Sequence, residues 1–302
     1  MRNALIKKNG MVISQILGGL GNQMFQYAAG RALSLASGHP LFLDLRGFKS
    51  YKLHNGFEIN NIFYAPVNSA TEFDLHRLLG WRAYELSLRA LRRAQSSLLR
   101  GKNLVIEPHF NYWRGLSEIR KPSYLMGYWQ SEKYFTDYED VIRSDFSFKQ
   151  PLDCENIKIS TYIQNSNSVS LHVRRGDYVT HASTSKILNI CSVDYYRHAI
   201  QYIAERVKFP HFYIFSDNIQ WVRDNIDIPF RVKYIDKNRG RNSFIDMHLM
   251  SLCKHHIIAN SSFSWWGAWL SQNRDQIVIA PHNWFRNGLN DGDLIPQRWI
   301  RL

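Results

Sequence analysis

The sequence predicts an α/β protein made of two domains, each with a doubly wound parallel sheet. Apolar, strand-like runs alternate with helical segments of ten or more residues, which is typical of a parallel sheet with crossover helices. The alternation begins again in the second half of the chain. The length of 302 residues accommodates two domains of ordinary size.

The first half opens with a strand at 12–16, a glycine turn, a helix at 22–36 and a second strand at 41–44. Gly38 and Pro40 end the helix. The segment 50–150 is less regular. The second half alternates strands at 168–173, 211–216, 231–235, 256–260 and 276–280 with helices at 193–207, 219–226, 242–254 and 262–271. Asn242 is the expected N-cap of the third of these helices. The two domains are expected to join near 148–160.

The net charge of +13 favours anionic partners. Basic residues concentrate in segment 81–102, where Trp81, Tyr84, Leu88, Leu91 and Leu98 recur at helical spacing. This basic helix is either a solvated face or a surface that docks on anionic lipid headgroups. Since no basic stripe is interleaved with aromatic residues in a known motif, we expect no nucleic-acid partner.

Three cysteines without a CxxC pair argue against a disulfide framework or a zinc ribbon. No apolar run approaches the ~18 residues that span a bilayer. The first ten residues lack the apolar core of a signal peptide. These features predict a cytoplasmic protein.

Three segments carry candidate chemistry. The first is the glycine turn at Gly18, Gly19 and Gly21, where a helix N-terminus can face an anion. A dinucleotide fingerprint fails, because its final glycine would be Met24, and no P-loop Lys-Ser/Thr follows. A purely structural turn remains the alternative.

The second segment is His172 to Tyr178 (HVRRGDY), at the carboxyl end of a buried strand. Ligands of open α/β sheets collect at such ends, and the forked donors of Arg174 and Arg175 suit a phosphate. The third is Asn260 to Trp269, where Ser261 and Ser262 can cap a helix and meet a diphosphate. The alternative for this segment is an N-cap before an aromatic core helix.

Two further patterns resemble metal-binding motifs but are not expected to bind a metal. Asp291-Gly292-Asp293 matches a metal-binding DxD but lies in a Gly/Asn-rich stretch that favours a surface turn. His248, His255 and His256 match no metal spacing and are expected to be structural or peripheral. The sequence therefore predicts no metal site.

Read together, these motifs closely resemble the bacterial α-1,2-fucosyltransferases of glycosyltransferase family 11. The resemblance rests on residues 18–27 (GGLGNQMFQY), 127–132 (GYWQSE), 172–178, 215–217 (FSD), 259–270 and 280–284 (APHNW). It runs from about residue 11 to 285, while segment 65–120 shows nothing familiar.

The resemblance implies two Rossmann-like domains facing across a cleft, the GT-B type. Residues 1–150 would form the acceptor-side domain and 151–302 the GDP-fucose-binding domain. It further implies inverting transfer of L-fucose from GDP-β-L-fucose to a galactose hydroxyl of an oligosaccharide, in O-antigen or surface polysaccharide synthesis. No metal or cofactor would be needed.

The resemblance also implies roles for single residues. Arg174 would bind the β-phosphate, with Arg175 as a second clamp. Looser similarity to protein O-fucosyltransferases implies further roles. Asn22, in the Gly-x-Gly-Asn-Gln pattern that begins with Gly19 and Gly21, would contact the donor or acceptor near the reacting centre, and Asp246 would recognise the guanine N–H edge. His172 would sit beside the nucleoside, while Ser261, Ser262 and Phe263 would hold the diphosphate and the ribose or base.

The resemblance leaves the identity of the general base open. Asp177 is the first candidate and Glu132 the second, since related α-1,6-fucosyltransferases carry a glutamate where this chain has Ala182. A dissociative transfer without an acidic base is also possible. A non-catalytic sugar-nucleotide or glycan binder is the alternative function. A lipid-linked acceptor at the inner membrane would give the basic helix a purpose.

Overall fold

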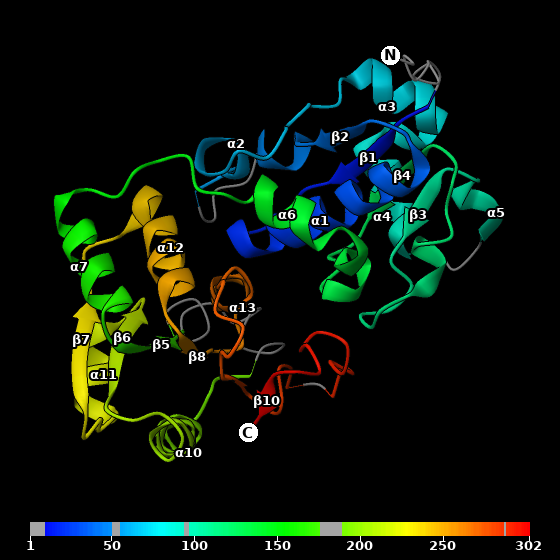
Figure 1. The fold of residues 1–302 in the computed structure, drawn as a ribbon. Coiled ribbons are helices and arrows are strands. Elements are labelled where there is room, and N and C mark those ends of the chain that lie inside the picture. The colour runs from blue at the N-terminus through cyan, green and yellow to red at the C-terminus, as the bar shows by residue number, and fades with distance from the viewer. Residues whose placement is uncertain (1–9, 50–54, 94–96, 176–188, 287) are drawn as a thin grey trace. The chain divides into compact units, whose positions relative to one another are not determined.

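The structure is a computed structural model that describes residues 10–49, 55–93, 97–175, 189–286 and 288–302. The chain divides into two compact units, Met1–Lys149 and Gln150–Leu302 (Figure 1). Each unit is an α/β fold around its own parallel sheet, as the sequence predicts. The acceptor and donor roles expected for the two halves stay predictions.

The N-terminal unit holds a four-stranded parallel sheet in the order β2-β1-β4-β3. Its strands are β1 Val12–Gln15, β2 Leu41–Asp44, β3 Leu104–Ile106 and β4 Ser123–Met126. Helix α1, Leu20–Ser37, connects β1 to β2 and ends at Gly38, whose φ of 72° is left-handed. The predicted strand, turn, helix and strand are confirmed.

Shorter elements follow in this unit. The helices are α2 Ile59–Ile62, α3 Glu72–Leu79, α4 Glu85–Arg93, α5 Ser97–Arg100 and α6 Glu139–Asp145. The 3-10 turns are η1 Arg46–Lys49, η2 Gly80–Ala83, η3 Arg114–Leu116, η4 Glu132–Tyr134 and η5 Thr136–Tyr138.

The basic segment is not the continuous helix that its spacing predicts. Its first turn is η2, and Tyr84 is extended (φ −64°, ψ 136°) before α4 begins at Glu85. Leu88 and Leu91 are buried, whereas Trp81 and Tyr84 are exposed. The predicted apolar stripe along one helix was therefore wrong. The extended backbone at Tyr84 changes the direction of the chain, so that Trp81 and Tyr84 do not share the buried face of α4.

The C-terminal unit holds a six-stranded parallel sheet in the order β10-β9-β8-β5-β6-β7. The strands are β5 Asn167–Val173, β6 Pro210–Ser216, β7 Arg231–Ile235, β8 His255–Ile257, β9 Val278–Ala280 and β10 Ile300–Arg301. Apolar side chains of β5 and β6 pack with helices α10, Val193–Ala204, and α11, Ile219–Asn225, in one core.

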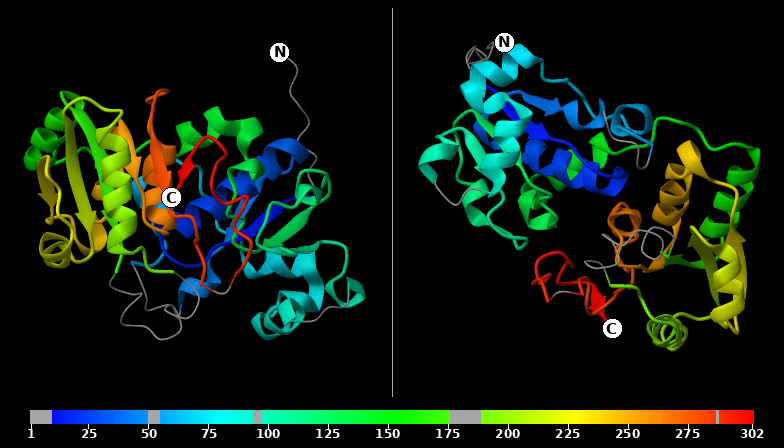
Figure 2. Two further views of the ribbon diagram at one scale, coloured as in Figure 1. Left: turned by 90° about the horizontal axis from the view of Figure 1, so that it is seen from below. Right: turned by 180° about the vertical axis from the view of Figure 1, so that it is seen from behind.

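Helix α12, Phe244–Leu252, packs against α7, Cys154–Gln164, and α13, Ser262–Trp269. Figure 2 gives two further views of these elements. The predicted N-cap Asn242 is wrong, because it ends the 3-10 turn η6, Gly240–Asn242, and Ser243 precedes α12. The three cysteines are free thiols.

Candidate active site

The carboxyl end of β5 brings Arg174 beside Asp217. Strands β5 and β6 pair in register, Val173 opposite Ser216, so the residues that follow each strand are neighbours. Arg174 Nη1 lies 3.2 Å from Asp217 Oδ2, and the backbone N–H of Arg175 donates to Asp217 Oδ1 at 3.0 Å. The partly buried Asp217 carboxylate therefore orients Arg174 at the edge of the sheet.

Arg175 points to a different partner. Its guanidinium lies 3.8 Å from the centroid of the Trp221 ring on α11, a cation–π contact. The two arginines thus do not form one paired clamp in this structure. A role for each in donor binding stays a prediction.

His172 and Phe263, both expected at the nucleoside, are brought together. Their ring centroids lie 6.0 Å apart, because β5 adjoins β8 and α13 follows β8. Burial, together with the Arg174 charge, lowers the pKa of His172 to about 3, so its imidazole is neutral at physiological pH. Among the described residues its buried Nδ1 finds no hydrogen-bond partner. A neutral ring with an unused polar atom suits a bound ligand.

Ser261 and Ser262 open α13 as predicted. Ser261 is the N-cap residue, but its side chain makes no capping hydrogen bond. The expected capping by its hydroxyl is therefore wrong, which leaves that hydroxyl outside the helix ladder at the helix N-terminus. Trp265, Trp266 and Trp269 are buried, so α13 is also a core helix.

Asp246 lies in the first turn of α12 at the end of a chain of amides. Asn238 Nδ2 donates to Asp246 Oδ1 at 2.8 Å, and the Asn238 and Asn156 side chains hydrogen-bond each other at 3.1 and 3.2 Å. Asn156 in turn donates to Asp153, the N-cap of α7. Burial raises the pKa of Asp246 to about 7, against the opposing effect of the Asn238 hydrogen bond. These hydrogen bonds hold the Asp246 carboxylate in place, and no sequence motif indicates them.

In the N-terminal unit, the glycine turn follows β1. Gly18 has a φ of 81°, a left-handed conformation that favours glycine, and a Cβ there would lie 2.9 Å from Asn22 Nδ2. Gly19 is the N-cap of α1, and Gly21 is buried in its first turn. Asn22 Oδ1 accepts a 2.7 Å hydrogen bond from Gln130 Nε2.

Gln26 joins the loops that follow β1 and β4. Its side chain accepts from the N–H of Leu17 at 2.8 Å and donates to the carbonyl of Gly127 at 3.1 Å. The GGLGNQ and GYWQ motifs, far apart in sequence, are therefore one hydrogen-bonded assembly. Adjacent parallel strands place both loops at the same sheet edge.

Glu107 anchors the second of these loops. It follows β3 directly, and its carboxylate accepts from the N–H of Tyr128 at 2.7 Å and of Trp129 at 2.9 Å. Trp129 is fully buried at a φ of 55°, a costly conformation for a side-chain-bearing residue. Burial raises the pKa of Glu107 to about 7 despite these two hydrogen bonds. Its position at a strand's carboxyl end was the signal that sequence reasoning missed.

The candidate bases are only partly placed. Asp177 and Ala182 lie outside the described residues. Glu132 begins η4, two residues after Gln130, and is partly buried. The identity of the base stays a prediction.

The DxD pattern lies in a turn, as predicted, and its first carboxylate has structural partners. Asp291 accepts from the N–H of Trp284 at 2.7 Å and pairs with Arg301 at 2.6 Å. His255 and His256 are bonded within the sheet, to Ile277 N and Ser170 Oγ. No cluster of three metal-ligating side chains is found among the described residues.

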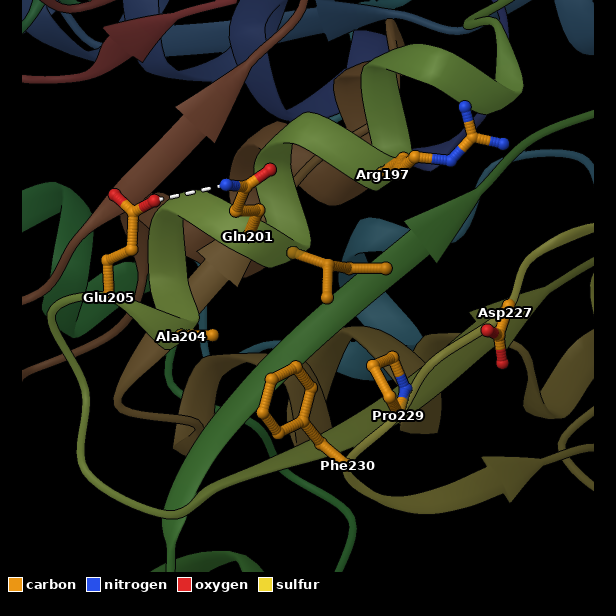
Figure 3. A pocket seen from close by; sticks show the side chains of 8 residues that line it. Arg197, Gln201, Ala204, Glu205, Asp227, Pro229 and Phe230 are labelled. Atoms are coloured by element: carbon orange, nitrogen blue, oxygen red, sulfur yellow. Dashed lines mark hydrogen bonds between the residues drawn. The ribbon is translucent and has the colours of Figure 1, made fainter.

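A hollow of about 460 Å³ lies elsewhere on the C-terminal unit (Figure 3). Helix α10 lines it with Ile200 and Ala204, and Pro229 and Phe230 face them. None of the predicted site residues lines this hollow. It therefore adds nothing to the candidate active site.

Among the described residues, no helix is both long and apolar enough to cross a bilayer.

Two α/β units, each with polar side chains at the carboxyl ends of its parallel strands, have the fold class of the GT-B glycosyltransferases. The chain belongs to glycosyl transferase family 11, whose model matches residues 110–301.

Relatives extend the match over the whole chain. The α-1,2-colitosyltransferase of Escherichia coli is 38% identical, covering 97% of this chain and 99% of the relative. The O-antigen biosynthesis glycosyltransferase WbnK of Escherichia coli is 34% identical, covering 96% and 99%. Galactoside α-(1,2)-fucosyltransferase 2 of Hylobates lar is 25% identical, covering 90% and 72%. The crystal structure of NodZ α-1,6-fucosyltransferase soaked with GDP-fucose shares the fold, with a TM-score of 0.52, 17% identity and coverage of 87% and 93%.

Proposed function

We propose that the protein is an inverting α-1,2-glycosyltransferase that moves L-fucose from GDP-β-L-fucose to a galactose hydroxyl of a surface-polysaccharide precursor. The observation that carries this proposal is end-to-end similarity to transferases named for an α-1,2 linkage and for O-antigen synthesis. The more distant galactoside α-(1,2)-fucosyltransferases support fucose and galactose as the sugars.

In the proposed reaction, the acceptor oxygen attacks C1 of fucose as the bond from C1 to the β-phosphate oxygen breaks. The β configuration of the donor becomes α, the acceptor proton leaves to a base, and GDP departs with added negative charge. In this proposal Arg174 stabilises that charge, and its ion pair with Asp217, which orients its side chain, supports the role. We propose that no metal or cofactor takes part, since Asp291 of the DxD pattern is already paired with Arg301.

A second donor has a specific observation in its favour. The 38% identical relative is named for colitose, a 3,6-dideoxy sugar that differs from fucose by one hydroxyl. A pocket that hydrogen-bonds the 3-hydroxyl would discriminate strongly against a sugar that lacks it. Comparing the two donors therefore determines which sugar is transferred.

The test is to incubate the full chain with lactose and either GDP-fucose or GDP-colitose, with and without EDTA. We expect a fucosylated product and equimolar GDP, an unchanged rate in EDTA, and anomeric proton signals for an α-1,2 linkage. Preference for GDP-colitose would reassign the donor. Tight GDP binding without turnover on any galactose-terminated acceptor would favour the non-catalytic binder, and loss of activity in EDTA would contradict metal independence.

A further inference from the structure

The N-terminal unit gathers its exposed apolar side chains in one segment. Seven large apolar side chains of this unit are exposed among the described residues, and five of them fall between 73 and 99. These five are Phe73, Trp81, Tyr84, Leu86 and Leu99, with exposed fractions from 51% to 78%. Such a concentration marks an interaction surface rather than scattered surface apolar groups.

The elements that carry these side chains are contiguous. Turn η2 contacts both α3 and α4, and Arg82 of η2 donates to the carbonyl of Leu99 in α5 at 2.6 Å. Leu75, Leu79, Leu88 and Leu91 on the underside are buried in the core against β3 and β4. The exposed set is therefore the outer face of a firmly anchored layer, which we call the α3–α5 face.

Basic side chains share this face. On α4, Leu86, Arg89, Ala90 and Arg93 follow helical spacing and are all exposed. From residue 72 to 102 the sequence holds seven arginines and lysines against three acidic residues, and one of these, Glu85, lies 3.8 Å from Arg89. Two guanidinium groups lie over exposed rings, Arg77 over Phe73 at 5.9 Å and Arg82 over Trp81 at 4.8 Å.

We propose that the α3–α5 face docks on an anionic lipid bilayer. Exposed Trp, Tyr, Phe and Leu suit the boundary between headgroups and acyl chains, and arginines beside them suit anionic headgroups. A second copy of the chain fits less well, because a two-fold interface would bring the same positive face against itself. The surface does not depend on the donor or the acceptor of the proposed reaction.

The experiment is sedimentation of the full chain with phosphatidylcholine vesicles that contain either no or one-third phosphatidylglycerol. We expect binding to the anionic vesicles that weakens with salt, and little binding to the neutral ones. The double variant Arg89→Gln with Arg93→Gln should weaken vesicle binding about 25-fold, because each lost arginine weakens it about fivefold and the two factors multiply. Leu86→Ser should also weaken it, since that side chain loses its apolar contact with the lipid.

The matched control is Arg197→Gln with Arg206→Gln, which removes two exposed charges from α10 and its following turn in the other unit. It should leave vesicle binding within about twofold. Equal loss in both double variants would mean that net charge, not this face, drives binding, and would overturn the proposal. An absence of vesicle binding would also overturn the proposal. A dimer that Leu86→Ser dissociates would show that the face binds a second copy of the chain instead. Tight binding to duplex DNA that Arg89→Gln with Arg93→Gln abolishes would show that it binds nucleic acid instead.

Discussion

Adjacent arginines in the sequence have separate surroundings in the fold. Successive side chains of an extended chain point to opposite sides, so Arg174 meets Asp217 while Arg175 turns to Trp221. Asp217 and Trp221 belong to β6's end and α11, some forty residues further along the chain. Sequence reasoning could name the arginines, but their partners depend on how β5 and β6 pair.

Arg174→Ala should therefore be the more damaging of the two arginine substitutions. Loss of one fixed donor to the departing diphosphate costs about 3–4 kcal/mol of transition-state stabilisation, or about a hundredfold to a thousandfold in kcat. Steady-state kinetics with GDP-fucose and lactose would measure it, with unchanged circular dichroism as the control. Activity within threefold of wild type would remove Arg174 from the mechanism.

Asp246 predicts a pH-dependent donor affinity. Recognition of guanine N–H groups requires the ionised carboxylate, and burial raises its pKa to about 7. GDP affinity should be flat above pH 8 and fall by up to about tenfold per pH unit below 7. Since burial raises the pKa of Asp246 above that of an ordinary aspartate, this group alone also makes the unliganded protein less stable as pH rises toward 7.

Calorimetric titration of GDP between pH 6 and 8.5 would measure this dependence. Asn238→Ala removes the donor to Asp246 Oδ1. It should weaken GDP binding and shift the dependence to higher pH, because the hydrogen bond that lowers the pKa of Asp246 is lost. A pH-independent affinity in both proteins would exclude Asp246 from base recognition.

At the scale of elements, the loops after β1, β3 and β4 form one assembly. Glu107 holds the Tyr128 and Trp129 amides, and Gln130 contacts Asn22. The motifs at 18–27 and 127–132 indicate the loops after β1 and β4, whereas Glu107 lies in segment 65–120, which resembles no known family. A three-residue strand followed by a lone acid is too weak a pattern to be recognised without its neighbouring strands.

Glu107→Gln should lower kcat while GDP affinity is preserved. Glutamine retains one acceptor oxygen and sets an NH₂ group against the second backbone N–H, a loss of about 1–3 kcal/mol at that contact. We expect kcat to fall about tenfold or more, because the loop that orients Asn22 is loosened.

Gln130→Ala is the companion variant in a double-mutant cycle. If Glu107 acts through Gln130, the double variant should be little worse than either single one. Fully additive losses would show that Glu107 does not act through this contact, and a lowered melting temperature with normal kcat would mean a purely structural role.

At the scale of the whole molecule, the residues expected to hold the nucleotide, from His172 to Phe263, lie in the unit Gln150–Leu302, whereas the glycine turn at Gly19 and Gly21 lies in the other unit. Hydrogen exchange of the intact chain with and without GDP tests this division. Peptides that cover β5, α12 and α13 should gain protection, since bound ligand suppresses local opening. Protection confined to peptides from Met1–Lys149 would contradict the assignment of the donor to the C-terminal unit.

The sequence by itself determined the parallel α/β class, the order of the described strands and helices from β5 to β9, and the motifs that identify family 11, but not α7 or β10. These depend on local periodicity and on short contiguous patterns, which a linear sequence contains. It failed at Asn242 and in segment 81–102, where a single turn or one extended residue resets the helical phase.

Only the tertiary structure decided the partners: Asp217 with Arg174, Asn238 with Asp246, Glu107 with the loop after β4, and Gln130 with Asn22. Each pair joins residues from different elements that parallel strand pairing or helix packing brings together. Their hydrogen bonds depend on distances and directions in space, and no spacing along the chain encodes these.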